Sequence, residues 1–217
     1  MAMSAEEVSR YLHDHPEFFD QYADLLALVT IPDPHTGRAI SITEKQLFTL
    51  REKVRTLEAK MAELIGFGEE NDVISEKVHA LGVALIAATD MDFVLDAIQA
   101  HLAGAFAVPR VVLRVWGIDG GERREFAPVS EAVKLLTSSL AIPECGPAEG
   151  QPALELFGPE AGGLRSMAQL PLRGAGGACF GLLAMASEDA TRFYPELGTL
   201  YLERIGEMVA AALLRVS

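Results

Sequence analysis

Two cysteines are the first candidates for covalent chemistry in this chain. Cys145 and Cys179 could form a redox pair, in which a thiolate attacks an oxidised sulfur. A reactive thiolate needs a neighbouring cation, yet no Lys or His adjoins either cysteine, and Glu144 raises the pKa of the Cys145 thiol. We expect both to be reduced, buried structural thiols, with thiol oxidoreductase chemistry as an alternative.

The histidines and carboxylates lack the spacing of a metal or acid–base site. His13 and His15 flank Asp14, but residues two apart on a helix point to different sides and cannot chelate one ion. No His-x-x-x-His, Cys-x-x-Cys or Gly-x-Ser-x-Gly pattern occurs, and the Glu69–Glu70 pair is typical of a solvated helix surface. The sequence predicts no catalytic residue, no metal ion and no cofactor, and hence a protein that is not an enzyme.

A glycine-rich stretch, residues 173–178, has the composition of a phosphate-binding loop. Such a loop needs a helix N-terminus directly after it, so that backbone amides face the anion. Residues 179–186 instead have the apolar character of a strand. The glycines are therefore expected to form a hairpin turn.

The composition restricts the possible partners. A chain of 217 residues with 50% hydrophobic content can bury a sizeable core, and its net charge of −13 repels phosphate backbones and anionic lipid. We expect no direct nucleic-acid or membrane binding, and a basic protein is the favoured heterologous partner. Residues 1–10 lack the features of a signal peptide, and no apolar run approaches the ~18 residues of a spanning helix. A cytoplasmic location is expected.

Residues 1–40 are predicted to form an N-terminal helical arm. Ser4 and Glu7 have the spacing of a capping box, which begins a short amphipathic helix. Pro16 lies in the first turn of a second helix, and a Pro- and Gly-containing segment after Ile31 ends it. The second helix needs a docking partner for its apolar face, which consists of Phe18, Phe19, Tyr22, Leu25, Leu26 and Val29.

Residues 41–89 are predicted to form a long connecting and dimerisation helix. Ser41, three residues before Glu44, offers a second capping box. Apolar residues then recur with the heptad spacing of a coiled coil, and Lys53 at position g would face Glu58 at position e of a parallel partner. The predicted dimer seam consists of Leu47, Leu50, Val54, Leu57, Met61 and Leu64.

The heptad repeat changes phase after Leu64. Two consecutive three-residue steps are typical of a stammer, which overwinds a coiled coil locally. Asn71 then occupies an a position, where a buried amide pair would fix the register of a homodimer. Gly66 and Gly68 lie at the phase change, and the open alternative is that they end the helix, because each costs ~1 kcal/mol relative to alanine.

Residues 90–217 are predicted to form an α+β domain. The apolar pattern changes from helical to alternating and back, with Gly-rich turns between the alternating segments. The expected elements are a helix capped by Asp90, paired strands at 110–116 and 122–126 around a turn at Asp119–Gly121, paired strands at 166–172 and 180–186, and a closing helix from Pro195.

A Pro- and Gly-rich segment, residues 127–165, separates the two expected hairpins. It is too long for a plain connector, so we expect an irregular lid or a surface adapted to a partner. Apolar residues there, together with one aromatic residue of the first hairpin, could line a pocket, although such residues are more often simply core. The candidate ligand-binding residues are Trp116, Cys145, Gly146, Leu154, Leu156 and Phe157.

Several local motifs occur together along the chain. They are LHDHPEFF at 12–19, IPDP at 31–34, residues 41–46 followed by Leu50–Arg51, Cys145–Gly146, and RFYP at 192–195 with Gly198–Thr199. This set resembles a bacterial domain-of-unknown-function family, number 484. The order of the expected elements resembles the GAF-like fold, an antiparallel sheet with packed helices.

The resemblance implies little about activity. Members of the family have no established activity, and the signature of GAF modules that bind cyclic nucleotides is absent, because the only asparagine is Asn71. One GAF-like enzyme class reduces free methionine sulfoxide with cysteines, which keeps the thiol alternative open. The family's genes often neighbour that of a tyrosine site-specific recombinase, which implies a possible accessory partner of recombination or cell-division machinery.

The preferred hypothesis is a non-enzymatic, dimeric, GAF-like regulatory or interaction module that binds an unidentified small ligand or protein partner. Two alternatives stay open at this point. One is an accessory partner of site-specific recombination or cell-division machinery, and the other is a thiol-based oxidoreductase.

Overall fold

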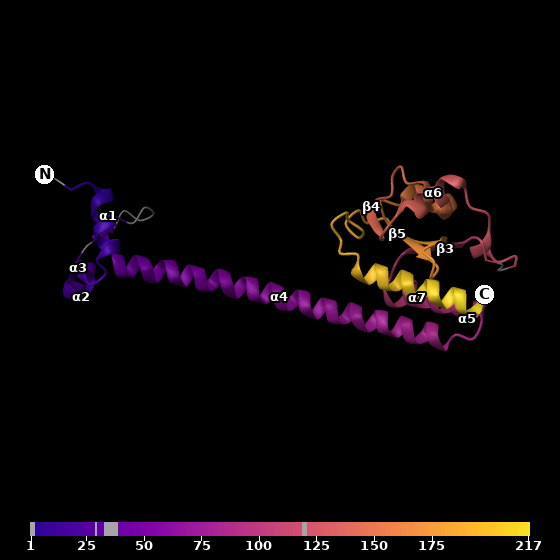
Figure 1. Cartoon of the computed structure of the whole chain (residues 1–217), viewed down its shortest axis with the longest axis horizontal. Helices are drawn as coiled ribbons and strands as arrows, with labels where there is room; N and C mark the ends of the chain where they lie inside the picture. The colour runs from indigo at the N-terminus through magenta and orange to yellow at the C-terminus, as the bar shows by residue number, and fades with distance from the viewer. Residues whose placement is uncertain (1–2, 29, 33–38, 119–120) are drawn as a thin grey trace. The chain divides into compact units, whose positions relative to one another are not determined.

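Helices and one four-stranded antiparallel sheet make up most of the chain, which is α+β as the sequence predicts (Figure 1). The chain forms two compact units, Met1–Gly68 and Glu69–Ser217. The computed structural model describes residues 3–28, 30–32, 39–118 and 121–217, with the backbone alone at 26–28, 30–32, 39–42 and 44.

Helix α1 (Ala5–Asp14) begins with the predicted capping box. The Ser4 hydroxyl accepts a hydrogen bond from the Glu7 amide at 3.2 Å, and the Ser4 amide donates to the Glu7 carboxylate at 2.8 Å. These two bonds satisfy amides that have no partner within the helix. The hydrogen bonds from Ser4 also lower the pKa of Glu7, because they stabilise its ionised form.

Two short helices replace the single helix predicted after Pro16. Helix α2 (Phe18–Gln21) ends at Tyr22, whose backbone leaves the helical region at φ −123° and ψ 40°, and α3 (Ala23–Leu28) follows. Strands β1 (Thr30–Pro32) and β2 (Ala39–Ser41) form an antiparallel pair that the sequence does not predict. Val29, the predicted break at 33–38 and the side chains of the Ser41–Glu44 box lie outside the described residues.

Helix α4 begins at Ile42 and ends at Ala87 without a break at Gly66 or Gly68. A Cβ atom added at either glycine would meet no atom within 4 Å. Neither glycine is therefore required for close packing, and the cost of two glycines does not end the helix. Of the two alternatives for this stretch, the structure has the continuous helix.

The sheet of the second unit has the strand order β3-β6-β5-β4. The predicted hairpin of 166–172 and 180–186 is confirmed by β5 and β6, but the predicted hairpin of 110–116 and 122–126 is wrong. Strand β3 pairs with β6 instead, and a 3-10 helix, η2 (Arg124–Phe126), occupies the expected return strand. Asp119 and Gly120 of the expected turn lie outside the described residues. The strands are β3 (Arg110–Val115), β4 (Glu144–Pro147), β5 (Ser166–Arg173) and β6 (Cys179–Ser187).

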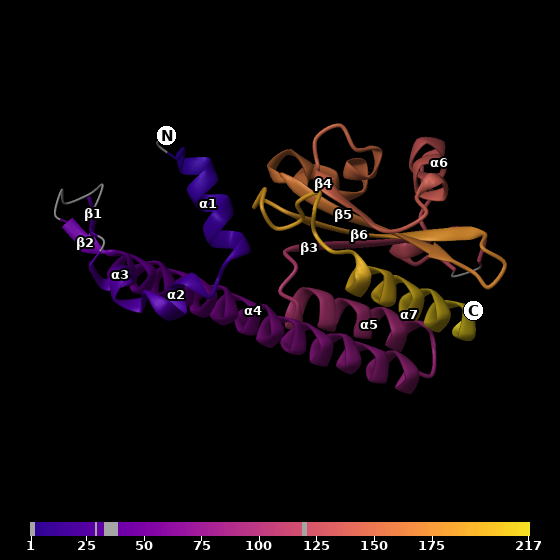
Figure 2. The same cartoon turned by 60° about the vertical axis from the view of Figure 1, so that its left-hand side comes forward.

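Helices cover both faces of this sheet (Figure 2). Alternate strand residues such as Leu170 and Met185 join a core with α5 (Met91–Gln99), the π-helix η1 (Ala100–Ala105), α7 (Leu200–Val216) and the C-terminal part of α4. Residues of the opposite parity, such as Met167 and Leu182, pack with α6 (Glu131–Ser139) and η3 (Pro152–Gly163). The two-residue side-chain period of a strand thus divides the interior into two cores.

The segment 127–165, predicted to be irregular, contains regular structure. The Ser130 hydroxyl accepts a hydrogen bond from the Val133 amide at 3.4 Å and so begins α6, while β4 extends the sheet beside β5. Prolines and glycines occur throughout this segment and interrupt its apolar periodicity, so the periodicity does not reveal the short helices and the strand. The closing helix α7 begins at Leu200, not at Pro195.

Arg215 of α7 binds the C-terminal end of α4. Its guanidinium donates hydrogen bonds to the carbonyl oxygens of Leu85 at 2.8 Å, Ala88 at 2.7 Å and Ile86 at 3.1 Å. Carbonyls at a helix C-terminus lack partners within the helix and carry partial negative charge. A cation from α7 therefore caps α4.

Candidate interaction surface and ligand cavity

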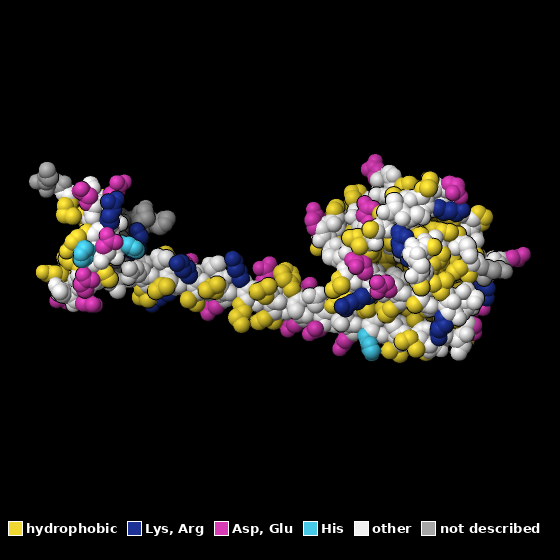
Figure 3. All heavy atoms as spheres, in the orientation of Figure 1, with side chains coloured by type: hydrophobic (Ala, Val, Ile, Leu, Met, Phe, Trp, Pro, Cys, Tyr) yellow, Lys and Arg dark blue, Asp and Glu magenta, His cyan; other side chains and the backbone are white. Residues whose placement is uncertain are grey.

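The predicted dimer seam lies exposed on α4. All six residues are apolar and leave about half or more of their surface accessible, and both Lys53 and Glu58 are exposed beside them. Figure 3 shows apolar side chains along this stretch of helix. The exposed fractions are 48% for Leu47, 57% for Leu50, 50% for Val54, 66% for Leu57, 64% for Met61 and 68% for Leu64.

The C-terminal continuation of the same stripe has a different environment. Val78, Leu81 and Leu85 are 7%, 0% and 2% exposed, because they pack in the core of the second unit. The side chain of Asn71 is exposed, and the backbone carbonyl oxygen of this residue accepts a hydrogen bond from the Tyr201 hydroxyl at 3.2 Å. The apolar stripe therefore has an intramolecular partner from Val78 onward, whereas residues 47–64 present their apolar side chains to solvent.

Leu156 and Phe157, two of the candidate ligand residues, line a cavity of about 440 Å³. Both side chains are mostly buried and belong to the core beneath α6 and η3. Gly158 adopts φ +57° at the cavity wall, which is the left-handed region that favours glycine. The other lining residues are Arg114, Arg124, Ala127, Pro128, Glu155 and Pro159.

Two arginines give this cavity a cationic wall. Arg114 comes from β3 and Arg124 from η2, and Glu155 supplies one carboxylate on the same lining. Burial, followed by the charge of Arg124, lowers the pKa of Arg114, because both disfavour a second positive charge at this position. Neither arginine can be predicted as a cavity residue from local sequence, because nothing in the neighbouring residues indicates what surrounds these side chains in the fold.

Trp116 and Leu154 lie in the same core as Leu156 and Phe157, but neither lines this cavity. The indole Nε1 of Trp116 donates a hydrogen bond to the Cys179 carbonyl oxygen at 3.2 Å. That bond holds the ring against β6. The structure thus brings four of the six candidate ligand residues into one core and two of them to a cavity.

Cys145 and Gly146, the remaining candidates, belong to β4. The Cys145 side chain points into the core on the other face of the sheet, with Leu170 and Leu172. Burial, together with the charge of Glu144, raises the pKa of Cys145 to about 11. The thiol is therefore protonated at neutral pH, and it does not share the cavity of Leu156 and Phe157.

The strand order separates the two cysteines, and both are free thiols. Strand β5 lies between the strands that carry them, which places their backbones ~10 Å apart across the sheet. Cys145 is also level with Met185 of β6, six residues from Cys179 along that strand. A disulfide needs Cα atoms within ~7 Å, so these two residues do not form one in this fold.

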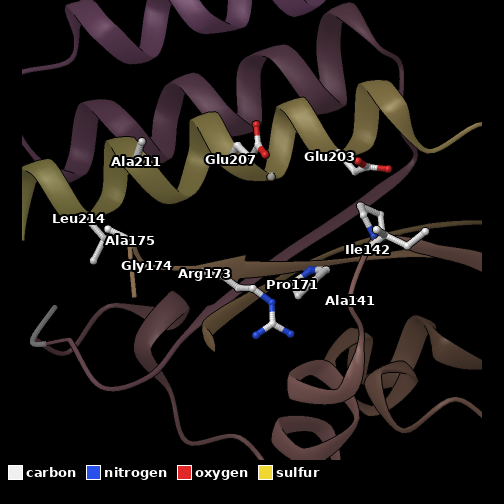
Figure 4. A pocket seen from close by; sticks show the side chains of 12 residues that line it. Ala141, Ile142, Pro171, Arg173, Gly174, Ala175, Glu203, Glu207, Ala211 and Leu214 are labelled. Carbon is white, nitrogen blue, oxygen red and sulfur yellow. The ribbon is translucent and has the colours of Figure 1, made fainter. Parts of the chain in front are cut away.

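A larger cavity, of about 500 Å³, lies between α7, the end of β5 and the chain before β4 (Figure 4). Glu203 and Glu207 project from α7, whereas the Arg173 side chain extends away from that helix. The Arg173 guanidinium donates to the carbonyl oxygens of Ser138, Leu140 and Gly177 at 2.7–2.8 Å. Arg173 therefore connects the glycine turn to the end of α6, and its role in this structure is to hold these two segments together.

Among the described residues, no three His, Cys, Asp or Glu side chains lie close enough to hold a metal ion together. Among the described helices, none has the length and apolar character required to cross a membrane.

These features define an α+β protein whose long helix carries an exposed heptad stripe. The chain belongs to the family described as "Protein of unknown function, DUF484", whose model matches residues 1–217. It is similar to the uncharacterized protein YigA of Salmonella typhimurium (strain LT2), with 26% identity over 214 residues, covering 94% of this chain and 88% of YigA. The predicted family is confirmed, and the likeness to GAF domains stays a prediction.

Proposed function

We propose that the chain is a non-enzymatic interaction module that dimerises through residues 47–64 of α4. The observation that carries the proposal is the exposed stripe of six apolar residues at heptad spacing. A contiguous apolar surface of this kind is a typical protein–protein contact, since solvent exposure of large apolar patches is unfavourable.

A second copy of the chain is the partner that fits this stripe. In a parallel dimer each a and d residue meets the same residue type of the other helix, which is the packing that heptad spacing provides. Lys53 at position g then faces Glu58 at position e of the partner, and Lys60 faces the uncharged Ile65. The g and e positions of this stretch contain no pair of like charges, so their electrostatics favour the parallel arrangement.

Native mass spectrometry with light scattering tests the dimer. Replacing Leu50 and Leu57 by Asp removes two leucines per chain whose exposed fractions are 57% and 66%. Burial of the exposed part of each leucine contributes ~1 kcal/mol, so the four leucines of a dimer contribute about 4 kcal/mol, which corresponds to about 1000-fold in Kd. We expect a dimer for the unaltered chain and a monomer for the double variant.

Thr49 and Thr56 provide a matched control. They are also seven residues apart, are exposed, and donate side-chain hydrogen bonds to Lys45 and Glu52 carbonyls of their own helix. Replacing both threonines by Asp adds the same charge to α4 away from the seam and should leave the dimer intact. A persistent dimer in the Leu50→Asp, Leu57→Asp variant, or equal loss in both variants, would refute the proposed seam.

A small anionic ligand is a second candidate function, as part of a regulatory module. The observation that favours it is the cavity of about 440 Å³ that combines Arg114 and Arg124 with the apolar side chains of Leu156 and Phe157. Cavities of this size and mixed character are typical of small-molecule sites. Native spectra of gently purified protein should show an adduct that is lost when Arg124 is replaced by Gln and Phe157 by Trp; spectra without an adduct would count against this function.

A further inference from the structure

A separate cavity, of about 400 Å³, lies on the α7 side of the sheet in the second unit. Its walls come from the C-terminal part of α4, from η1 and the residues after it, from β6, from α7, and from the segment between β6 and α7. They are mainly aliphatic and aromatic, and include Leu102, Phe106, Met185, Phe193, Tyr201 and Ile205. Volumes from about 300 to 1,000 Å³ are typical of small-ligand sites.

Two cations lie in this apolar lining and converge on one residue. The ammonium of Lys77 is 5.8 Å from the centre of the Phe106 ring, and Arg192 donates from Nη2 to the Phe106 carbonyl oxygen at 2.8 Å. Both residues are only partly exposed. A lysine and an arginine from elements 115 positions apart in the sequence are thus brought to the same wall.

Neither cation is neutralised by an ion pair within the described part of the chain. The Nε atom of Arg192 is buried and has no hydrogen-bond partner among the described residues. The Asp189 carboxylate accepts hydrogen bonds from the amide and hydroxyl of Thr191. The charge of Arg192 also contributes to the lowered pKa of Asp189, but the two side chains form no ion pair among the described residues. A buried donor without an acceptor is unfavourable, and the guanidinium that carries this donor lies on the lining of the cavity.

The chemistry of the lining restricts the ligand. Among the described residues on the lining, the Tyr201 hydroxyl is the only polar side-chain group besides the two cations, and it already donates to the Asn71 backbone carbonyl oxygen. These residues include no carboxylate or side-chain amide to recognise the donors of a sugar or a base. A single anionic group on an apolar body matches two cations in an apolar cavity.

We infer that this cavity binds a small carboxylate with an apolar body, whose carboxylate lies between Lys77 and Arg192 and whose apolar part contacts the side chains around Phe106. Charge-assisted hydrogen bonds to the two cations would position the head group. The surrounding aliphatic and aromatic side chains would provide most of the contact area. This site differs from the cavity at Arg114 and Arg124 on the other face of the sheet.

Isothermal titration calorimetry of the full chain with octanoate at pH 7.5 tests the inference, with 1-octanol as the neutral match. Octanoate should bind with one site per chain and at least about tenfold more tightly than 1-octanol, because hydrogen bonds between ionised groups are stronger than those of a neutral hydroxyl. Replacing Lys77 by Gln should weaken octanoate binding by about tenfold and leave 1-octanol binding unchanged.

Two further variants keep the test independent of Lys77. A Cβ atom at Gly198, on the cavity lining, would meet no atom within 4 Å, so Gly198→Leu can fill the cavity without changing a charge and should abolish octanoate binding. Lys134→Gln removes an equal charge on α6, where Lys134 pairs with Glu131, and should have no effect. Failure of octanoate to bind at millimolar concentration, equal affinity for 1-octanol, or unchanged binding in both Lys77→Gln and Gly198→Leu would overturn the inference.

Discussion

The cap that Arg215 forms on α4 allows a quantitative prediction about stability. Replacing Arg215 by Met keeps an unbranched side chain of similar length and removes the guanidinium. The carbonyl oxygens of Leu85, Ile86 and Ala88 then lose three hydrogen bonds and a positive charge at the helix end. Water can reach some of these oxygens, so the loss is smaller than for fully buried groups.

The hydrogen-bond geometry gives the expected size of the effect. The two bonds from Nη2, at 2.8 and 2.7 Å, are partly buried and contribute about 1 kcal/mol each, whereas the bond to Ile86 is exposed and adds little. A cation at a helix C-terminus adds about 0.3–1 kcal/mol. The Arg215→Met variant should therefore lose about 2–3 kcal/mol of unfolding free energy, a large part of the ~5–15 kcal/mol typical of a domain.

Trp116 is the only tryptophan of the chain and lies in the same unit as Arg215, so its fluorescence reports unfolding of that unit in urea. The midpoint should fall at an unchanged slope, with both proteins at one concentration. Arg204→Met on the same helix is the control, since Arg204 is exposed and its described contact is with the Tyr201 ring at 5.8 Å. If Arg215→Met lost less than about 0.5 kcal/mol, or no more than Arg204→Met, the Arg215 guanidinium would not stabilise α4 as a cap.

Three other predictions follow from the second unit. Gly181→Ala should cost about 1–3 kcal/mol, because its Cβ would lie 2.8 Å from the Arg114 carbonyl oxygen, whereas Gly176→Ala meets no atom within 4 Å; urea unfolding compares them. Cys145 should react with iodoacetamide only as the pH approaches about 11, the raised pKa of its thiol, and rapid labelling at pH 8 would contradict this. The ordinary pKa of the thiol is 9.0, so as the pH rises above that value the thiol of the unfolded chain ionises before that of the folded chain. The free energy of unfolding should therefore fall between these two pKa values. Asp90→Ala removes the acceptor of an amide in the first turn of α5 and should lower the melting temperature through a loss of ~1 kcal/mol, and an unchanged value would exclude a stabilising cap.

Local signals predict the parts of the fold that depend on neighbouring residues. The Ser4 capping box and the Asp90 cap each need only the next three residues, and both are present. Apolar alternation likewise locates the strands at 110–116, 166–172 and 180–186. Caps and strand alternation depend on residues only a few positions apart, so a short stretch of sequence is enough to predict them.

Pairing between distant segments was harder to predict. The turn expected near Gly121 favoured a local partner for β3, but β6 offers a longer apolar strand, and it forms six residue pairs with β3. The same limit applies to the candidate site. The apolar character of Leu156 and Phe157 in a Pro- and Gly-rich segment predicts them as pocket residues, whereas the arginines beside them become neighbours only through the fold. Cys145 faces the other core because of the strand register, which composition does not reveal.

The contacts between α4 and α7 have a consequence for the order of folding. The hydrogen bond from Tyr201 to Asn71 spans 130 residues, and the bond from Arg215 to Ala88 spans 127. Contact between α4 and α7 therefore closes a chain loop that includes the whole sheet. The chain loses conformational entropy when this loop closes, before the contacts between the two helices can compensate for that loss. High contact order of this kind slows folding. Until α7 has docked, Val78, Leu81 and Leu85 remain uncovered on the same helix as the proposed dimer seam, so early association of two chains would compete with correct closure of each domain.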